Sequence, residues 1–275
     1  MRFLTTTRHS PALSVIGLFS VFFPLQADAV TIIGDSFNTG LALNASVNGR
    51  TPDVSLTGST WVTNTTLISG DGAGGLKVSY SDTRNIALDL GANYFINNPG
   101  IYELSLTITS PAAESSGSWI GFGFTQGQGN SLSPASASVA GQPWLVYRQN
   151  GGIDVFAGPQ NTNSLTNGAG QPTSTASQGT PHTFTLRLDT SATDWTLQYL
   201  LDGTLMDLGT NGSQTHTFTT QPTIQYLMVS MGGGTAAGTG TVDNFSFISV
   251  PEPGTAFLAG LSALTLLSRR RLRNS

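Results

Sequence analysis

The residues of this chain that could perform covalent chemistry are few. Two histidines, His182 and His216, lie in its middle part, each within a Thr-rich alternating segment. The sequence contains no cysteine and no G-x-S-x-G signature of an activated serine. We therefore interpret both histidines as solvent-facing strand residues, with a general base or a metal ligand as the alternative.

Paired carboxylates are equally sparse. Retaining glycoside hydrolysis requires two carboxyl groups about 5–5.5 Å apart. Glu103 and Glu114 are the only glutamates between residues 30 and 249, and Asp89 and Asp154 stand singly among apolar neighbours. The sequence therefore predicts that this part of the chain is not an enzyme.

Metal sites have little support in the residue spacing. Zinc motifs of the H-x-x-x-H or H-E-x-x-H type are absent. Asp71, in a glycine-rich loop, and the pair Asp189 and Asp194 could supply oxygen ligands for calcium. None of them follows the D-x-[DN]-x-[DN]-G spacing, which favours plain turn roles. We predict no cofactor, with structural calcium as the open alternative.

Aromatic residues offer binding chemistry instead. Sugar rings stack on aromatic faces, while polar side chains nearby bond to their hydroxyl groups. Candidate platforms are Trp61, Trp119, Trp144, Trp195, Tyr147 and Tyr226. Trp144, Tyr147 and the adjacent Arg148 are the first candidates for glycan contacts. The alternative for each ring is core packing, because a large apolar ring contributes most when buried.

The elements that must position these residues are short alternating segments bounded by Gly, Asn, Asp or Pro. In 102–108 every second residue is apolar, the period of a half-buried strand. Asp202-Gly203 predicts a two-residue hairpin turn. Similar segments are 76–80, 85–90, 101–110, 119–125, 144–148, 153–157, 182–189, 195–201, 216–219, 224–231 and 241–248. Together they predict an all-β fold, a two-sheet antiparallel β-sandwich of jelly-roll type.

The carboxyl-terminal residues Val250–Ser275 have a different character. Val250-Pro251-Glu252-Pro253 interrupts regular structure, and a short apolar stretch, 255–267, follows it. Arg269, Arg270, Arg271 and Arg273 then form a basic stop-transfer cluster. The apolar stretch, about 20 Å long as a helix, is short for a permanent membrane span.

This tail resembles the PEP-CTERM sorting signal of bacterial surface proteins. The resemblance implies cleavage near Pro-Glu-Pro by an exosortase-type membrane protease. It also implies a Gram-negative cell that makes extracellular polysaccharide. The body would be anchored transiently in the inner membrane on its periplasmic side, and would then reach the cell surface or the extracellular matrix.

The amino terminus reads as a secretory signal peptide. Arg2 and Arg8 precede an apolar region, 12–23, and Ala27-Asp28-Ala29 matches an A-x-A cleavage site. The predicted partners are therefore the secretion translocon and signal peptidase. We divide the chain into a signal peptide, 1–29, a β-sandwich domain, 30–249, and a sorting signal, 250–275, and expect a short helix in each terminal segment.

The body also resembles concanavalin A-like lectin/glucanase and laminin-G-like sandwiches. The resemblance rests on Asp35-Ser36-Phe37, the segment 43–61, the hairpin 195–206 and 242–246. It implies that the first and last strands pair and bring Phe37 near Phe245. Retaining glucanases of this fold carry an E-x-D-x-x-E run, which this sequence lacks.

The net charge of the predicted domain limits the classes of partner that it can bind. Between residues 30 and 249 there are five Lys and Arg against thirteen Asp and Glu, a net charge of −8. A nucleic-acid partner is not expected, because the basic footprint that neutralises phosphates is absent. We expect a non-enzymatic surface or matrix protein that associates with exopolysaccharide. The alternatives are a secreted glycan-active enzyme, either a hydrolase or a lyase, and a ligand-free coat protein.

Overall fold

The computed structural model describes residues 28–63, 68–78, 84–110, 118–128, 132, 141–158, 165, 174–208, 212–232 and 240–251. The chain divides into two compact units. One unit, Met1–Ala27 with Pro253–Ser275, lies outside the described residues. The other, Asp28–Glu252, contains all of them and is called the body below.

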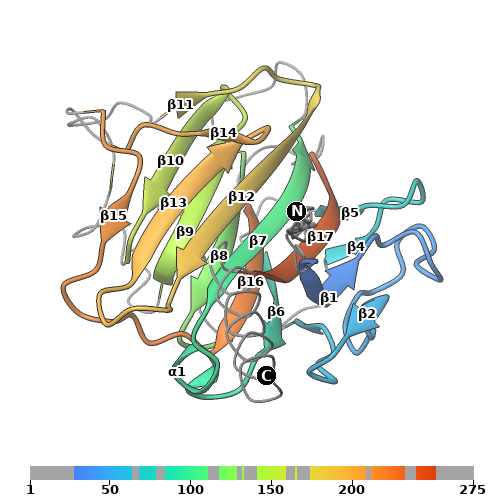
Figure 1. Ribbon diagram of the computed structural model, residues 1–275. Helices are drawn as coiled ribbons and strands as arrows, with labels where there is room; N and C mark the ends of the chain where they lie inside the picture. The colour runs from blue at the N-terminus through green and yellow to red at the C-terminus, as the bar shows by residue number, and fades with distance from the viewer. Residues whose placement is uncertain are drawn as a thin grey trace, which may run out of the picture. The chain divides into compact units, whose positions relative to one another are not determined.

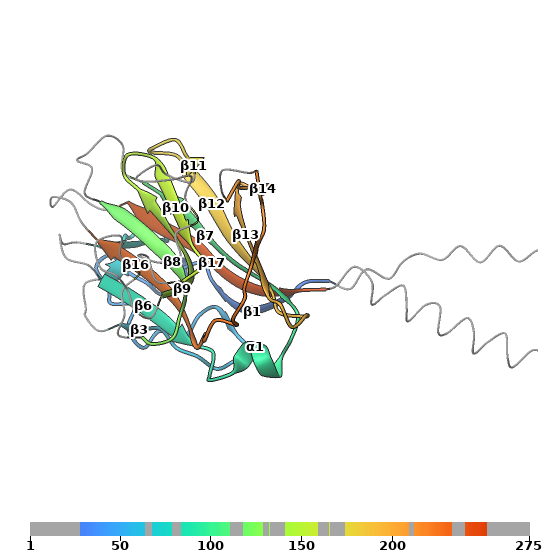
Figure 2. The ribbon, with the colours of Figure 1, turned by 90° about the vertical axis from the view of Figure 1, so that its left-hand side faces the viewer.

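The body is an all-β sandwich of two antiparallel sheets, drawn in Figures 1 and 2. The larger sheet has ten strands among the described residues. Their spatial order is β14 (Thr204–Leu205), β13 (Thr196–Leu201), β12 (Pro181–Asp189), β7 (Ile101–Thr109), β17 (Thr241–Val250), β1 (Val30–Asp35) and β2 (Val54–Ser55). Beside this path, β15 (His216–Thr217) pairs with β13, β5 (Leu76–Val78) with β17, and β4 (Ile68–Gly70) with β5.

The second sheet has seven strands in the part of the chain that the structure describes. Their order is β11 (Ser174–Thr175), β10 (Gly152–Phe156), β9 (Gly141–Arg148), β8 (Trp119–Thr125), β16 (Tyr226–Gly232), β6 (Arg84–Asp89) and β3 (Val62–Thr63). One short helix, α1 (Tyr94–Asn97), follows β6.

The main core lies between the two sheets, because side chains alternate across each strand. On β7, Tyr102, Leu104, Leu106 and Ile108 are buried, while the residues between them are half-exposed. Strand β12 pairs with β7 in register, with Phe184 opposite Leu106. The pattern predicted from the sequence at 102–108 is therefore confirmed.

In the central strands of the seven-stranded sheet, buried and exposed residues do not alternate, because both faces of the sheet are covered there. Every residue of β8 and of β10 is buried. The inner side chains join the main core, whereas the outer ones form a second cluster. Its members are Ala87, Trp119, Leu132, Trp144, Val146, Phe156 and Met228, with Tyr226 packed against them.

The first and last strands of the body pair, as expected from the resemblance. Val30 lies opposite Ser249, and Asp35 lies opposite Phe245. Phe37 and Phe245 both pack against Trp61, with ring centroids 5.7 Å and 5.0 Å from it. The opening and closing segments of the body therefore share one part of the core.

The two predicted terminal helices are not part of this architecture, because they fall on residues outside the described ranges. Within the described residues, no helix is long and apolar enough to cross a membrane. The four-residue helix α1 was not predicted, since it shows no amphipathic period.

Candidate functional site

The structure places the first two candidates for glycan contact inside the molecule. Trp144 is fully buried and stacks on Phe156 at a centroid distance of 4.1 Å, and its Nε1 donates to the carbonyl of Gly158. Tyr147 is 1% exposed and points into the main core. Neither ring has a face open to a sugar. Both are corrected from stacking platforms to packing residues, the alternative that the sequence had left open.

Arg148 keeps a polar role at the end of β9. Its guanidinium pairs with Asp154, with Nη2 2.6 Å and Nε 2.8 Å from Oδ2. The Arg148 side chain is 33% exposed and the Asp154 side chain 12%. An arginine already held by a carboxylate offers fewer free donors to a ligand.

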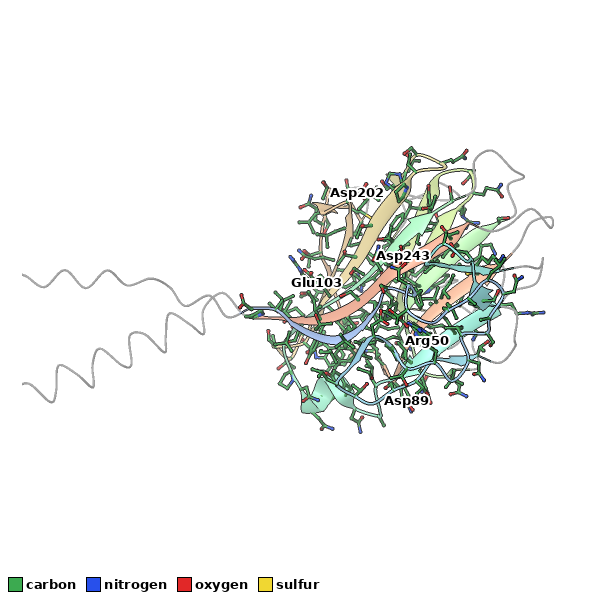
Figure 3. All side chains as sticks on the ribbon, turned by 90° about the vertical axis from the view of Figure 1, so that its right-hand side faces the viewer. Arg50, Asp89, Glu103, Asp202 and Asp243 are labelled. Carbon is green, nitrogen blue, oxygen red and sulfur yellow. The ribbon has the colours of Figure 1, made fainter. Side chains whose placement is uncertain are left out.

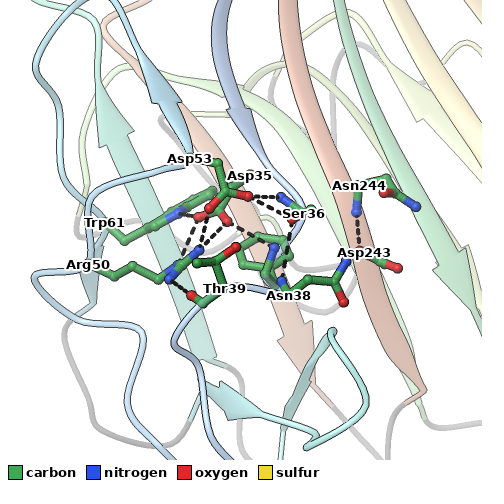
Figure 4. A network of polar contacts seen from close by, with 10 residues as sticks. Asp35, Ser36, Asn38, Thr39, Arg50, Asp53, Trp61, Asp243 and Asn244 are labelled. Atoms are coloured by element: carbon green, nitrogen blue, oxygen red, sulfur yellow. Dashed lines mark hydrogen bonds and ion pairs between the residues drawn. The ribbon is translucent and has the colours of Figure 1, made fainter.

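A buried ionic network organises the amino-terminal segment of the body, as Figure 4 shows. Asp35 accepts bonds from the Nη2 of Arg50 at 2.7 Å, the Nε1 of Trp61 at 2.7 Å and the backbone N–H of Phe37 at 2.9 Å. Asp53 accepts from Arg50 and from Ser36. These partners satisfy the Asp35 carboxylate, so the network is a structural device.

The calcium candidates make turn contacts. Asp71 Oδ1 accepts the backbone N–H groups of Ala73 and Gly75, at 2.7 and 2.8 Å. Asp189 Oδ1 accepts from the backbone N–H and the hydroxyl of Ser191. In the part of the chain that the structure describes, no group of three or more His, Cys, Asp or Glu could hold a metal ion, and this includes Asp194.

Glu103 forms a cross-strand ion pair rather than a carboxylate pair. Its carboxylate faces Arg187 on the neighbouring strand β12, where the Nε–Oε1 distance is 2.7 Å (Glu103 is labelled in Figure 3). Glu114 lies outside the described residues. This part of the ten-stranded sheet therefore does not supply the two facing carboxyl groups of a retaining glycosidase.

A polar cluster at the end of β6 and the start of β16 was missed by the sequence analysis. The Nε2 of Gln225 lies 3.1 Å from the phenol oxygen of Tyr226 and 3.3 Å from Oδ1 of Asp89. The backbone N–H of Gly91 fixes the same carboxylate oxygen at 2.7 Å. Loss of solvation and the charge of Asp89 raise the pKa of Tyr226, so its phenol keeps its proton.

A pocket of about 160 Å³ adjoins this cluster. We call it the Gln225 pocket. Its lining comprises Ala92, Asn93, Phe95, Ile96, Trp195, Gln221, Pro222, Thr223, Ile224 and Gln225. The lining thus combines three side-chain amides, those of one asparagine and two glutamines, with the apolar surfaces of Phe95, Ile96 and Trp195. Amides both donate and accept hydrogen bonds, which suits a neutral ligand with many hydroxyl groups.

Sequence reasoning missed this pocket because no motif marks it. Its residues come from three stretches, 92–96, 195 and 221–225, which only the fold brings together. Two signals were available, since Trp195 and Tyr226 stood among the candidate aromatic platforms. Trp195 is 3% exposed and contributes to the pocket, whereas Tyr226 borders it through Gln225.

The predicted processing residues lie only partly within the body. Ala29 directly precedes β1, Val250 ends β17 and pairs with Ile101 of β7, and Pro251 follows it. Because Val30 pairs with Ser249, both predicted cleavage points lie at the same end of one strand pair. Outside the described residues are Ala27, Glu252, Pro253, Arg269, Arg270, Arg271 and Arg273.

No family model matches the chain, and no curated protein matches it. Solved structures do match. An endo-1,3-β-glucanase from Streptomyces sioyaensis has 17% identity and a TM-score of 0.52, over 82% of this chain and 97% of the glucanase. The Emp47p carbohydrate recognition domain has 14% identity and a TM-score of 0.47, over 80% and 95% of the two chains. A Trypanosoma rangeli sialidase has 14% identity and a TM-score of 0.49, over 82% of this chain but 32% of the sialidase.

The body thus has the concanavalin A-like lectin/glucanase sandwich fold. The glucanase match also corrects the expectation that the body is not an enzyme, because a glycan-cleaving enzyme has this fold over nearly its whole length. A similarity of 17% identity shows a shared fold and not a shared activity, so the chemistry of this chain depends on its own residues.

Proposed function

We propose that this protein is an exported bacterial surface or matrix protein whose body binds a neutral polysaccharide at the Gln225 pocket. The observation that carries the proposal is the combination of amide side chains, the Asp89 carboxylate and the Tyr226 phenol beside apolar aromatic surface. A net charge of −8 on residues 30–249 favours a neutral glycan, since an acidic one would be repelled.

Binding of the full-length protein to immobilised neutral exopolysaccharides tests this proposal. Gln225→Ala removes an amide from the pocket and should weaken binding about 3- to 10-fold, the effect of one or two lost hydrogen bonds. Gln198→Ala is the matched control, because Gln198 is a half-buried glutamine on β13 whose amide bonds to Thr215. Equal binding by both variants and the unchanged protein would contradict the pocket assignment.

The export route is the second part of the proposal. The signal peptide would direct the chain to the secretion translocon, and an exosortase-type protease would cut near Pro251. Mass measurement and terminal peptide mapping of the protein from its native envelope and medium should give a chain that starts at Val30 and ends near Val250. A mature protein that still carries Arg270 and Arg271 would contradict it.

A glycan-cleaving activity is the second candidate, favoured by the fold shared with the glucanase. Soluble oligosaccharides would then accumulate when the protein is incubated with the polysaccharide that it binds. Binding without release would leave the pocket as a recognition site alone.

A further inference from the structure

Three side chains at the other end of the sandwich are arranged as a nucleophile, a base and an orienting carboxylate. The Oγ of Ser177 lies 2.9 Å from Nε2 of His182, and Nδ1 of His182 lies 2.7 Å from Oδ2 of Asp202. Both distances fall within the range expected for a hydroxyl activated by an imidazole. None of the three residues belongs to the Gln225 pocket, and Asp202 and Asp89 lie far apart in Figure 3.

The fold explains why the three residues meet. On β12, Phe184, Leu186 and Leu188 face the main core, so the alternation also turns His182 inward at the start of the strand. The His182 side chain is 14% exposed, and its ring centroid lies 6.4 Å from that of Tyr147. The imidazole is therefore held at the rim of the core.

Asp202 is fixed by the hairpin between β13 and β14. Asp202 and Gly203 have φ angles of 50° and 78°, as a two-residue hairpin turn requires. Oδ1 of Asp202 accepts the backbone N–H of Thr183 at 2.9 Å, which leaves Oδ2 to face His182. Partial burial raises the pKa of Asp202, but the bonds from His182 and Thr183 outweigh it and hold that pKa below its usual value.

An ionised Asp202 selects the tautomer of His182. At 2.7 Å from a carboxylate oxygen, Nδ1 must carry the proton, so the lone pair of the neutral ring lies on Nε2. Nε2 faces the hydroxyls of Ser177 and Thr180, at 2.9 and 3.1 Å. The Thr180 hydroxyl lies 2.7 Å from that of Ser177, so Thr180 can donate to Ser177 while Ser177 donates to Nε2.

The protonated ring also has a partner in place. The carbonyl oxygen of Ser177 lies 3.1 Å from Nε2 and would accept its proton after transfer. The phenol of Tyr147 donates to the same carbonyl at 2.9 Å and so fixes the Ser177 backbone. Nε2 therefore has a hydrogen-bond partner for either role, a hydroxyl when it accepts and a carbonyl when it donates, as a general base requires.

We propose that Ser177, His182 and Asp202 form a nucleophilic centre that hydrolyses esters of short carboxylic acids. Ser177 and Thr180 are both exposed, which gives a small acyl group direct access to the hydroxyl. The inference is independent of the proposed glycan binding, because it uses other residues at another place.

The chemical steps balance with water as the second reactant. Oγ of Ser177 bonds to the ester carbonyl carbon while its proton passes to Nε2 of His182. The bond to the alcohol oxygen breaks, and that oxygen takes the proton from Nε2, which leaves Ser177 acylated. Water then attacks the acyl carbon, its proton returns through Nε2 to Oγ, and the carboxylic acid leaves.

Covalent labelling of the full-length protein with a fluorophosphonate, followed by peptide mapping, tests the nucleophile. We expect the phosphonyl group on Ser177, and no labelling of the Ser177→Ala variant. Ser191→Ala is the matched control, because the hydroxyl of this exposed serine bonds to Asp189 and not to a histidine. Label on Thr180, label elsewhere, or no label on the folded protein would overturn the proposal.

Hydrolysis of p-nitrophenyl acetate tests the base and the carboxylate. His182→Gln should lower the rate about 10²- to 10⁴-fold, the usual contribution of a general base. Asp202→Asn should also lower it, although Asn tolerates the same turn conformation. The thermal midpoint of each variant shows that it is folded. Rates equal to that of the unchanged protein in both folded variants would overturn the centre.

Discussion

At the scale of single residues, Asp35 decides how the amino-terminal segment is held. Its side chain is fully buried and bonds to Arg50, Trp61 and the Phe37 backbone. Breaking a buried ion pair costs about 3–5 kcal/mol, and removal of this carboxylate also leaves the buried Nε1 of Trp61 and the N–H of Phe37 without their acceptor. Asp35→Ala should therefore lower the free energy of unfolding, measured in urea, by that amount.

Asp53→Ala is the control for this prediction. Asp53 bonds to the same Arg50, but its side chain is 31% exposed. Exposed ion pairs contribute about 0–1 kcal/mol, so the loss should be several-fold smaller. Equal losses from the two variants would mean that Arg50, and not the burial of Asp35, controls the stability of this segment.

From the lowered pKa of His216 we predict how the stability of the protein depends on pH. It lies half-buried on β15 beside Phe218, and burial lowers its pKa below the ordinary 6.5. The unfolded chain then takes up a proton at a higher pH than the folded protein does. The contribution of His216 to the free energy of unfolding is therefore fully present above about pH 6.5. It is lost as the pH falls from there through the lowered pKa of His216 in the folded protein.

The measurement is the thermal midpoint between pH 7.5 and 5. The unchanged protein should lose stability across this window, and His216→Gln should lose less because the titrating group is gone. An identical slope for the variant would assign the loss to other groups.

At the scale of elements, glycines set how closely β8 and β9 approach. Gly123 of β8 has a φ of 152°, and a Cβ there would lie 2.5 Å from the carbonyl oxygen of Pro143 and from the Cα of Trp144. Backbone atoms cannot move aside cheaply, so Gly123→Ala should cost about 3 kcal/mol or more.

Gly203→Ala is the control that separates the cost of a positive φ from the cost of a steric clash with neighbouring backbone. Gly203 also has a positive φ, but no atom lies within 4 Å of a Cβ at this position. Only the backbone cost of about 1–2 kcal/mol then remains. Denaturant unfolding of the two variants compares the costs, and a larger loss for Gly203→Ala would mean that β8 and β9 can separate without penalty.

The strands were largely predictable, because local alternation and turn residues define them. The Asp202-Gly203 turn and the strands around 101–110 and 182–189 follow the prediction closely. The exposure of Trp144 was not predictable, since its strand has apolar neighbours on both faces and alternation tells only which residues share a face. The Gln225 pocket and the Ser177 centre depend on contacts between distant segments, which no local pattern records.

At the scale of the whole molecule, the strand pairing is compatible with the proposed cut near Pro251. Strand β17 lies between β7 and β1, so it is an inner strand of the ten-stranded sheet. Its last residue, Val250, still pairs with Ile101, and Pro251 follows, which has no N–H to extend the ladder. A cut directly after Val250 therefore leaves every pair of β17 intact.

Two truncated proteins test this argument. A chain of residues 30–250 should unfold at the same temperature as the body of the full-length protein, because no sheet pairing is lost. A chain of residues 30–240 lacks β17. Without this strand, β1 loses its connection to β7, and the core loses Phe245 and Phe247. It should fail to give a cooperative transition in circular dichroism. Cooperative unfolding of the shorter chain would show that the closing strand is dispensable, and the position of Pro251 would then have no structural reason.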